Sequence, residues 1–343
     1  MEDQRIQTAY IREEALDCLN IEDLKENVLS GLRTQQAEWA EKIKEIRKLC
    51  KQKDKTCTQE EFARRCGVKR DATSKWSNGA IPRHRETFLR IALTAGYTIP
   101  ETDRLLQRYG GYSGLYSKTL EDCVCIYVIE HVPEAERIDA YDRILKRILE
   151  KACCHFPDGV TEDITTHRLD EKLGAVQSVE ELERFILENI TVFSYAYHRV
   201  QTYAEVFIQE NYLNNDVYEL TSINALAESQ GWSSSLKRDI YKILKKEWDP
   251  DRETIISMGI HLEMDTEQVD LMLGMAHMEP LCAKNAYECA VMFILEDVKR
   301  VEEYGREAFE PVEHAVQILR KLGMEDEAKA LAGTREEERE LDT

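Results

Sequence analysis

Proline and glycine are scarce in this sequence, with 7 and 15 among 343 residues. Because these residues interrupt helices and form turns, their scarcity favours long helices joined by short connections. No apolar run is long enough to cross a bilayer, and the first residues, MEDQRIQTAY, lack the apolar segment of a signal peptide. We therefore expect an all-α, cytoplasmic protein that does not interact with a membrane.

Paired metal-binding motifs are also missing. The ten cysteines form no CxxC pair and no Cys/His spacing that is typical of a zinc site. Most of them lie in apolar helical patterns, where a free thiol packs as a small hydrophobic group. The CxC at Cys123 and Cys125 and the CCH at Cys153–His155 are the remaining candidates for metal or redox chemistry. We expect structural thiols, no metal and no cofactor.

Catalytic signatures are equally hard to find. The sequence contains no phosphate-binding loop of the GxxxxGK type, no GxSxG and no HExxH. Its eight histidines are scattered, and none lies beside a nucleophile motif. We therefore expect a binding protein and no enzyme.

The charge of the chain is strongly acidic overall but basic in one region. The formal net charge is −20, from 66 acidic and 46 basic residues. Residues 41–91 nevertheless contain 15 Lys or Arg against 7 Asp or Glu, a net charge of +8. Because binding to phosphate depends on the local patch, this segment is a candidate for contact with nucleic acid. The acidic remainder would repel DNA and help to orient this face toward it.

The sequence resembles itself in four blocks that follow one another in the same order. IEDLKENVL from Ile21 matches VEELERFIL from Val179, and GLYSKTLEDCVCIYVIE (Gly114–Glu130) matches PLCAKNAYECAVMFILE (Pro280–Glu296). Between these blocks, Gly67 matches Gly231, and the Arg-Glu-Thr that begins at Arg85 matches the one that begins at Arg252. We interpret the pattern as two copies of one helical unit.

This interpretation predicts four consecutive regions. The first repeat occupies residues 1–130 and contains a helix-turn-helix at about 37–109. A helical connection follows at 131–162, and a second, degenerate repeat at 163–297. Residues 298–343 are predicted to form an acidic tail with two amphipathic helices.

The helix-turn-helix is predicted from TQEEFARRCGVKRDATSKWSNG, which begins at Thr58. Thr58 can cap a helix, with Glu61 three residues later closing a capping box. Gly67 then supplies the positive φ of a tight turn. A second helix follows, with Ala72 and Trp76 four residues apart on its buried side, and Asn78-Gly79 ends it.

The polar side chains of the second helix are the candidate DNA contacts. With Ala72 and Trp76 facing inward, the helix from Arg70 to Trp76 would enter the major groove by its N-terminal end. The predicted base contacts are Lys69, Arg70, Asp71, Ser74 and Lys75. Residues around the motif are expected to contact phosphates: Lys51, Lys53, Lys55, Thr58, Gln59, Asn78, Arg83 and Arg85. Lys48 precedes them and could follow the backbone as well.

These residues resemble a known family. TQEEFARRCGVKRDATSKWSNGAIPR is similar to the lambda-repressor-like, or Xre-type, helix-turn-helix of bacterial and phage regulators, and FLRIALTAGYTIPETDRLL resembles the later helices of that family. Thr73 stands where the family usually has Ile or Val, so a weaker core contact is expected there. The resemblance implies sequence-specific binding to double-stranded DNA as a homodimer on a palindromic operator, and thereby transcriptional regulation, most often repression.

The second repeat carries a weaker signal for DNA. Residues 224–260 contain six basic and six acidic residues, and the Asn-Gly is lost. Arg238, Lys242, Lys245 and Lys246 still form a basic stripe at helical spacing, which leaves a second DNA contact open. The alternative interpretation is a scaffold or dimer surface.

Two further hypotheses remain at this level. The aromatic stretch Phe193–Tyr212 either packs between helices or forms a pocket for a small-molecule effector, and this region or the acidic tail could also bind a protein partner. The alternative function for the whole chain is a non-catalytic interaction adaptor. In it the helix-turn-helix folds serve as scaffolds, as in a phage-defence or mobile-element system.

Overall fold

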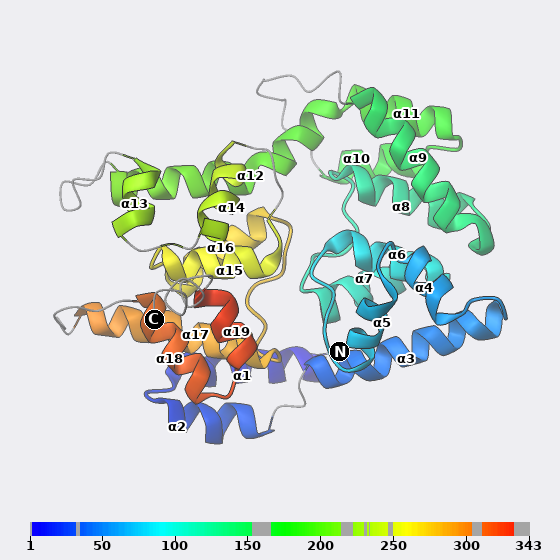
Figure 1. Ribbon diagram of the computed structural model, residues 1–343. Helices are drawn as coiled ribbons and strands as arrows, with labels where there is room; N and C mark the ends of the chain where they lie inside the picture. Colours follow the sequence, from blue (N-terminus) through cyan, green and yellow to red (C-terminus); the bar gives the residue numbers. More distant parts are fainter. Residues whose placement is uncertain are drawn as a thin grey trace. The chain divides into compact units, whose positions relative to one another are not determined.

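The computed structural model describes residues 2–31, 35–152, 166–213, 222–229, 232, 234–245, 250–303 and 311–332 (Figure 1). Throughout these ranges the regular elements are helices, and no β-strand is present among them. The predicted all-α class is therefore confirmed. None of the helices in these ranges has the length and apolar character that a bilayer crossing requires.

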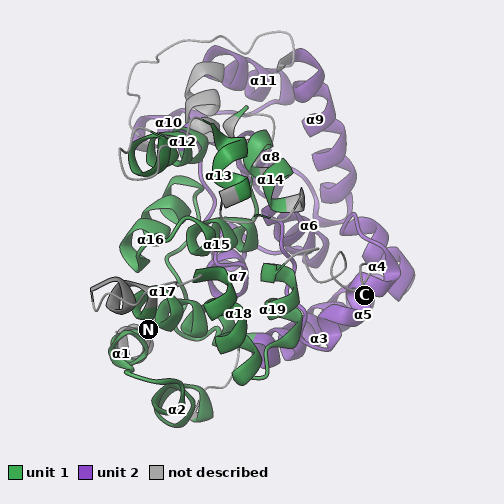
Figure 2. Cartoon of the chain, turned by 60° about the vertical axis from the view of Figure 1, so that its left-hand side comes forward, with its two compact units in different colours: residues 1–35, 200–343 green, residues 36–199 purple. Residues whose placement is uncertain are grey.

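The chain divides into two compact units, coloured separately in Figure 2. Unit 1 consists of residues 1–35 and 200–343, and unit 2 consists of residues 36–199. These units differ from the consecutive regions expected from the sequence. Residues 1–35, the beginning of the first predicted repeat, belong to unit 1, which contains most of the second repeat. Residues 163–199, the beginning of the second predicted repeat, belong to unit 2, which contains most of the first repeat.

Unit 2 contains the basic segment. Its elements are α3 (Gln35–Lys53), α4 (Gln59–Arg65), α5 (Arg70–Ser77), α6 (Arg85–Ala95), α7 (Ile99–Leu105), η3 (Leu106–Gly110), α8 (Leu120–His131), η4 (Glu134–Glu136), α9 (Arg137–Ala152), α10 (Thr166–Gly174) and α11 (Val179–Glu188). The helix α12 (Ile190–Ile208) begins in this unit and ends in unit 1.

Unit 1 combines the N-terminal helices with the rest of the chain. Its elements are α1 (Glu2–Asp17), α2 (Ile21–Asp23), η1 (Leu24–Val28), η2 (Leu29–Gly31), η5 (Gln209–Leu213), α13 (Ile223–Ser229), α14 (Ser234–Leu244), α15 (Arg252–His261), α16 (Thr266–Met275), α17 (Ala286–Glu303), α18 (Pro311–Lys321) and α19 (Glu325–Ala332). The two helices predicted for the C-terminal region are thus present as α18 and α19, and α18 packs on α15 and α17.

An aromatic cluster fixes the core of unit 2 beneath the helix-turn-helix. Trp39 of α3 is fully buried, and its ring centroid lies 5.6 Å from that of Phe88 and 5.5 Å from that of Tyr109. The indole Nε1 of Trp39 donates a hydrogen bond of 2.9 Å to the carbonyl of Ala80. Because a buried indole N–H needs a partner, this bond ties the loop after α5 to α3.

A buried ion pair joins α6 to α8 in the same unit. The Arg85 guanidinium contacts the fully buried Asp122 carboxylate with Nε at 3.0 Å and Nη2 at 2.5 Å. Its two Nη atoms also donate to the carbonyls of Ser113 and Gly114, each at 2.8 Å. Four hydrogen bonds of this arginine are directed into the unit, so it has a structural role.

Candidate DNA-binding surface

The helix-turn-helix is formed by α4 and α5. Thr58 has extended backbone geometry and its Oγ1 accepts a hydrogen bond from the Glu61 N–H, which confirms the predicted helix cap. Gly67 has a φ of +70°, and the N–H of Val68 bonds back to the carbonyl of Ala63. This left-handed turn ends α4 and directs the chain into α5, as the sequence predicts.

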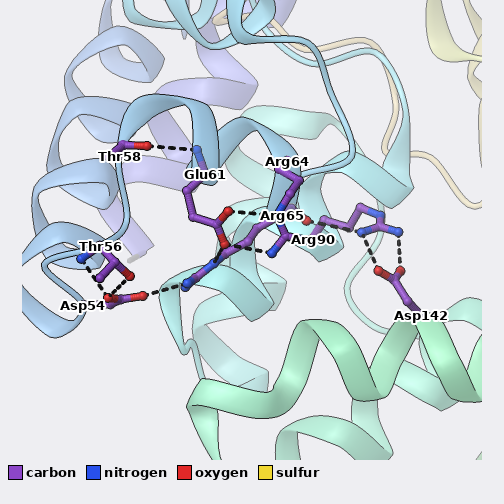
Figure 3. A network of polar contacts seen from close by, with 8 residues as sticks. All are labelled: Asp54, Thr56, Thr58, Glu61, Arg64, Arg65, Arg90 and Asp142. Carbon is purple, nitrogen blue, oxygen red and sulfur yellow. Dashed lines mark hydrogen bonds and ion pairs between the residues drawn. The ribbon is translucent and has the colours of Figure 1, made fainter.

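The hydrogen bond from the Thr58 backbone N–H to the Glu61 side chain, which would complete the predicted capping box, is not formed. The Glu61 carboxylate turns away from the Thr58 backbone and accepts hydrogen bonds from Arg64 and Arg65, all at 2.8 Å (Figure 3). Arg65 lies between Glu61 and Asp54, which it contacts at 2.6 Å. Two arginines within reach outcompete the single backbone N–H as partners for this carboxylate.

These arginines make the stability of the motif sensitive to acid. Hydrogen bonds from Arg64 and then Arg65 lower the pKa of Glu61 from its usual 4.5 to about 2. A carboxylate whose pKa is depressed in the folded state stabilises the fold at pH values above its pKa in the unfolded state. That contribution is lost as the pH falls toward the pKa of the folded state. We expect Glu61→Gln to cost about 1 kcal/mol at pH 7 and to remove part of the stability loss between about pH 4.5 and pH 2.

Urea denaturation of both proteins at several pH values measures this effect. Glu60→Gln is the matched control, because Glu60 lies next in the chain and is exposed. An unchanged pH profile for Glu61→Gln would contradict the assignment.

The buried face of α5 differs by one position from the prediction. Thr73 and Trp76 are buried, with Thr73 fully so, whereas Ala72 is only half-buried. The Thr73 hydroxyl donates to the Arg70 carbonyl at 2.7 Å and accepts from Gln59 Nε2 at 3.2 Å. Both bonds satisfy a hydroxyl that would otherwise be costly inside the core. Thr73 therefore contributes a polar link between α4 and α5 in place of the apolar contact of the family.

All five predicted base-contact residues are exposed. Lys69 precedes the first turn of α5, and the other four lie on the helix itself: Arg70, Asp71, Ser74 and Lys75. The Ser74 hydroxyl accepts a 2.8 Å hydrogen bond from Gln59 Nε2. Gln59, expected to contact phosphate, is thus held against α5, where it orients Ser74.

The predicted phosphate contacts fall into two groups. Exposed members are Lys51, Lys55, Thr58, Asn78 and Arg83. Arg85 must be removed from the set, because it is bonded to Asp122 inside the unit. Lys53 is exposed, and its Nζ contacts Glu134 at 2.7 Å and donates to the Ala95 carbonyl at 3.1 Å. This surface ion pair compensates part of its charge, so Lys53 is a weaker candidate for phosphate than the lysines without a carboxylate partner.

A basic stripe on α3 extends this surface. Lys44, Lys48 and Lys51 are exposed and recur at intervals of four and three residues, so they share one side of the helix. Arg47, one helical turn from Lys44 and from Lys51, contacts Ser77 at the end of α5 with Nη1 at 3.1 Å from Oγ. The stripe therefore lies on the α5 side of α3.

Acidic residues of α3 lie next to the stripe. Glu38, Glu41 and Glu45 recur at intervals of three and four residues, and Glu41 and Glu45 are each one helical turn from a lysine of the stripe. Glu38 pairs with Arg108 of η3 at 2.9 Å. Lys44 was not among the predicted contacts. The i, i+4, i+7 spacing of Lys44, Lys48 and Lys51 could have identified it, but only with knowledge of which side of α3 faces α5.

Most of the remaining basic residues of this region are neutralised. Arg64 and Arg65 pair with Glu61, and Arg90 pairs with Glu86 and Asp142. Figure 3 shows the contacts of Arg64 and Arg65 with Glu61 and those of Arg90 with Asp142. By contrast, no carboxylate of the described residues pairs with Lys44, Lys48, Lys51, Lys55, Lys69, Arg70 or Lys75. The uncompensated positive charge is thus concentrated on α3, α5 and the loop after α3.

The second predicted DNA contact lies on α14 of unit 1. Arg238, Lys242 and Lys245 are exposed, and Lys246 lies outside the described residues. Trp232, just before α14, is buried with its N–H bonded to the Ala227 carbonyl at 2.8 Å.

The aromatic stretch and the CxC motif contain described side chains that pack inside the protein. The hydroxyl of Tyr212, at the end of the aromatic stretch, is buried and donates to the Leu262 carbonyl at 2.6 Å. Side chains of residues 190–198, in the first part of that stretch, lie outside the described set. Cys123 and Cys125 are buried in α8, where burial raises the pKa of each thiol. Cys153–His155 also lie outside the described residues.

Comparison with known proteins gives no match: no family, curated protein or solved structure is significantly similar to this chain.

Proposed function

We propose that this protein binds double-stranded DNA in a sequence-specific manner through α5 and acts as a transcriptional regulator, most simply a repressor. The observation that carries the proposal is the α4–α5 turn, after which Lys69, Arg70, Asp71, Ser74 and Lys75 are all exposed on one short helix. An exposed, polar helix of this kind fits the major groove, whose width accepts an α-helix.

The charge distribution supports a duplex as the partner. Positive charge that no described carboxylate neutralises lies both on α5 and on the adjacent stripe of α3. The side chains of α5 would reach base edges, and the lysines of the α3 stripe would contact the flanking phosphates. Ionic attraction to phosphate supplies affinity whatever the sequence, whereas Arg70 and Lys75 suit guanine O6 and N7.

Gln59 supports the geometry from within the motif. Its amide bonds both to the buried Thr73 and to the exposed Ser74, so α4 fixes the rotation of α5 about its own axis. A base-reading helix needs such support, because its side chains must be held to within about 0.5 Å of a productive geometry.

Selection from a random-sequence duplex library tests the proposal. We expect the wild-type chain to enrich a defined motif at low salt, and the same library presented as single strands to give none. A chain that enriches no motif and retains no duplex at low salt would support the adaptor alternative instead.

The α3 stripe makes a separate prediction. Lys48→Ala with Lys51→Ala should weaken binding to every duplex and reduce the slope of log K against log salt concentration by about 2, because about 0.9 is lost for each phosphate contact. Arg143→Ala with Lys146→Ala, two exposed basic residues of α9, is the matched control and should leave the slope unchanged. A sequence-dependent loss in the lysine variant would mean that the stripe contacts bases.

A further inference from the structure

The first helical segments of the two predicted repeats, hereafter arm 1 (residues 2–31) and arm 2 (residues 166–189), share their local structure. The Asn20 side chain accepts from the Asp23 N–H, and the Ser178 side chain accepts from the Glu181 N–H. Four residues after each cap, Leu24 and Leu182 are fully buried. The blocks that match in sequence thus have the same cap and the same buried position.

Arm 2 packs into unit 2. Its helix α11 lies against α8 and α9, and Glu183 contacts Arg147 and Lys151 of α9, at 2.5 Å and 2.8 Å. Burial, followed by Asp122 and Glu121, raises the pKa of Cys123 in α8, and Asp170 of α10 raises it further. Asp170 therefore lies near α8. Arm 2 therefore covers the last helix of the first repeat's helix-turn-helix framework.

Arm 1 packs into unit 1 in the corresponding way. Its helix α1 lies against α17, and the Arg12 guanidinium pairs with Asp270 of α16 and donates to the Leu281 carbonyl at 2.8 Å. Cys18 at the end of α1 is near Cys289 of α17, the residue that matches Cys123 in the sequence. Each arm thus packs on the repeat to which it does not belong.

The frameworks that receive the arms have matching contacts. Arg252 contacts Glu288 with Nε at 2.7 Å and donates to the carbonyls of Glu279 and Pro280, as Arg85 does with Asp122, Ser113 and Gly114. The Sγ of Cys289 bonds to the Ala283 carbonyl, and that of Cys123 to the Ser117 carbonyl.

The backbones match even where the residues differ. Gly96 and Gly111 of unit 2 have positive φ, and the equivalent positions of unit 1 are Glu263, with a φ of 52°, and His277, with a φ of 56°. Side chains rarely adopt this conformation, and within the described residues these are the two non-glycine examples. Because they occupy the positions equivalent to the two glycines, the two frameworks share the same backbone conformation at these turns.

We infer that the chain is a single-chain counterpart of a dimer whose subunits exchange their N-terminal arms. After arm 1 the chain enters unit 2 at the beginning of α3, and after arm 2 it returns to unit 1 within α12. Each repeat therefore has its arm in one unit and most of its remaining helices in the other. Exchange of identical elements between protomers is a known route to dimers.

Recognition of DNA by one chain follows, and this step depends on the proposed function. Each helix-turn-helix framework is completed by the other repeat, so a second copy of the chain is not needed to complete either. In one chain, α5 of unit 2 then serves as the base-reading helix. This replaces the homodimer expected from the sequence with a complex of one chain and one duplex.

Hydrogen exchange of the full chain tests the arm exchange without DNA. Leu182→Ala in arm 2 should accelerate amide exchange about 30-fold or more in α8 and α9, with little change in α15 and α17. Arg12→Ala in arm 1 should accelerate exchange in α16 and α17 and leave α8 unchanged. If Leu182→Ala does not fold, Ile186→Val should give a smaller, several-fold increase at the same helices. Acceleration of α15 and α17 by the arm 2 variants would overturn the inference.

Sedimentation of the free chain and of its DNA complex tests the stoichiometry. We expect a monomer of 39.9 kDa and a complex of one chain with one duplex. A stable dimer, or two chains on each duplex, would overturn the single-chain assembly. If the chain binds no DNA at all but remains monomeric with the expected exchange pattern, the proposed function fails while the arm exchange stands.

Discussion

Replacing Arg85 with methionine is expected to lower the free energy of unfolding of unit 2 by about 3 to 5 kcal/mol, because it leaves a buried carboxylate without its partner. Asp122 is fully buried and receives both the Nε and the Nη2 of Arg85. The same substitution leaves the Ser113 and Gly114 carbonyls without their donors. Methionine retains much of the side-chain volume, so the loss reports mainly on charge and hydrogen bonds.

Chemical denaturation followed by tryptophan fluorescence measures this loss, since Trp39 and Trp76 are buried in unit 2. Arg64→Met is the matched control: Arg64 is exposed and pairs only with Glu61 among the described residues, so a change of about 1 kcal/mol or less is expected. Equal effects of the two substitutions would show that Asp122 is not held by Arg85.

Alanine at both Arg70 and Lys75 is expected to abolish the preference for the selected duplex. A good contact to a base edge contributes about 1 to 3 kcal/mol of discrimination, so the two together should reduce affinity for the selected sequence by roughly 30-fold or more. Random-sequence duplex should lose much less, because it loses only the attraction of two charges to phosphate. The specificity ratio is therefore the informative quantity.

Fluorescence anisotropy with the two duplexes gives that ratio. Arg143→Ala is the control for loss of an exposed arginine, since Arg143 is exposed on α9 and is not among the predicted contact residues. Equal losses on selected and random duplex for the Arg70 and Lys75 variant would remove α5 from base recognition and leave it a general phosphate contact.

Local features of the binding motif could be predicted from the sequence because local interactions determine them. The cap at Thr58, the turn at Gly67 and the exposure of Arg70 and Lys75 depend on residues within one or two helical turns. The rotation of α5 was less predictable, since one of the two hydrogen bonds of the buried Thr73 hydroxyl comes from Gln59, 14 residues earlier.

The errors concern residues whose partners are distant in the sequence. Arg85 lies beside other basic residues, but its partner Asp122 is 37 residues away. Lys53 belongs to a run of lysines, but Glu134, 81 residues away, neutralises it. A local charge count includes both as free cations, and only the tertiary structure shows that Arg85 is held inside the unit and that Lys53 is paired.

The exchange of arms could not be predicted for a related reason. Sequence similarity shows that residues 21–28 and 179–186 match, but it does not show which framework either arm contacts. Each arm's unit is known only from the folded chain, which enters unit 2 at the beginning of α3 and returns to unit 1 within α12. That path is a property of the folded chain.

The salt dependence of duplex binding tests the central claim most directly. Lys44, Lys48, Lys51, Lys55 and Asn78 would provide about five phosphate contacts, four of them ionic, so log K should fall against log salt concentration with a slope of about −4 for the wild-type chain. Binding that tightens at low salt with this slope, despite a formal charge of −20, is the predicted result. No detectable binding at low salt would contradict the account.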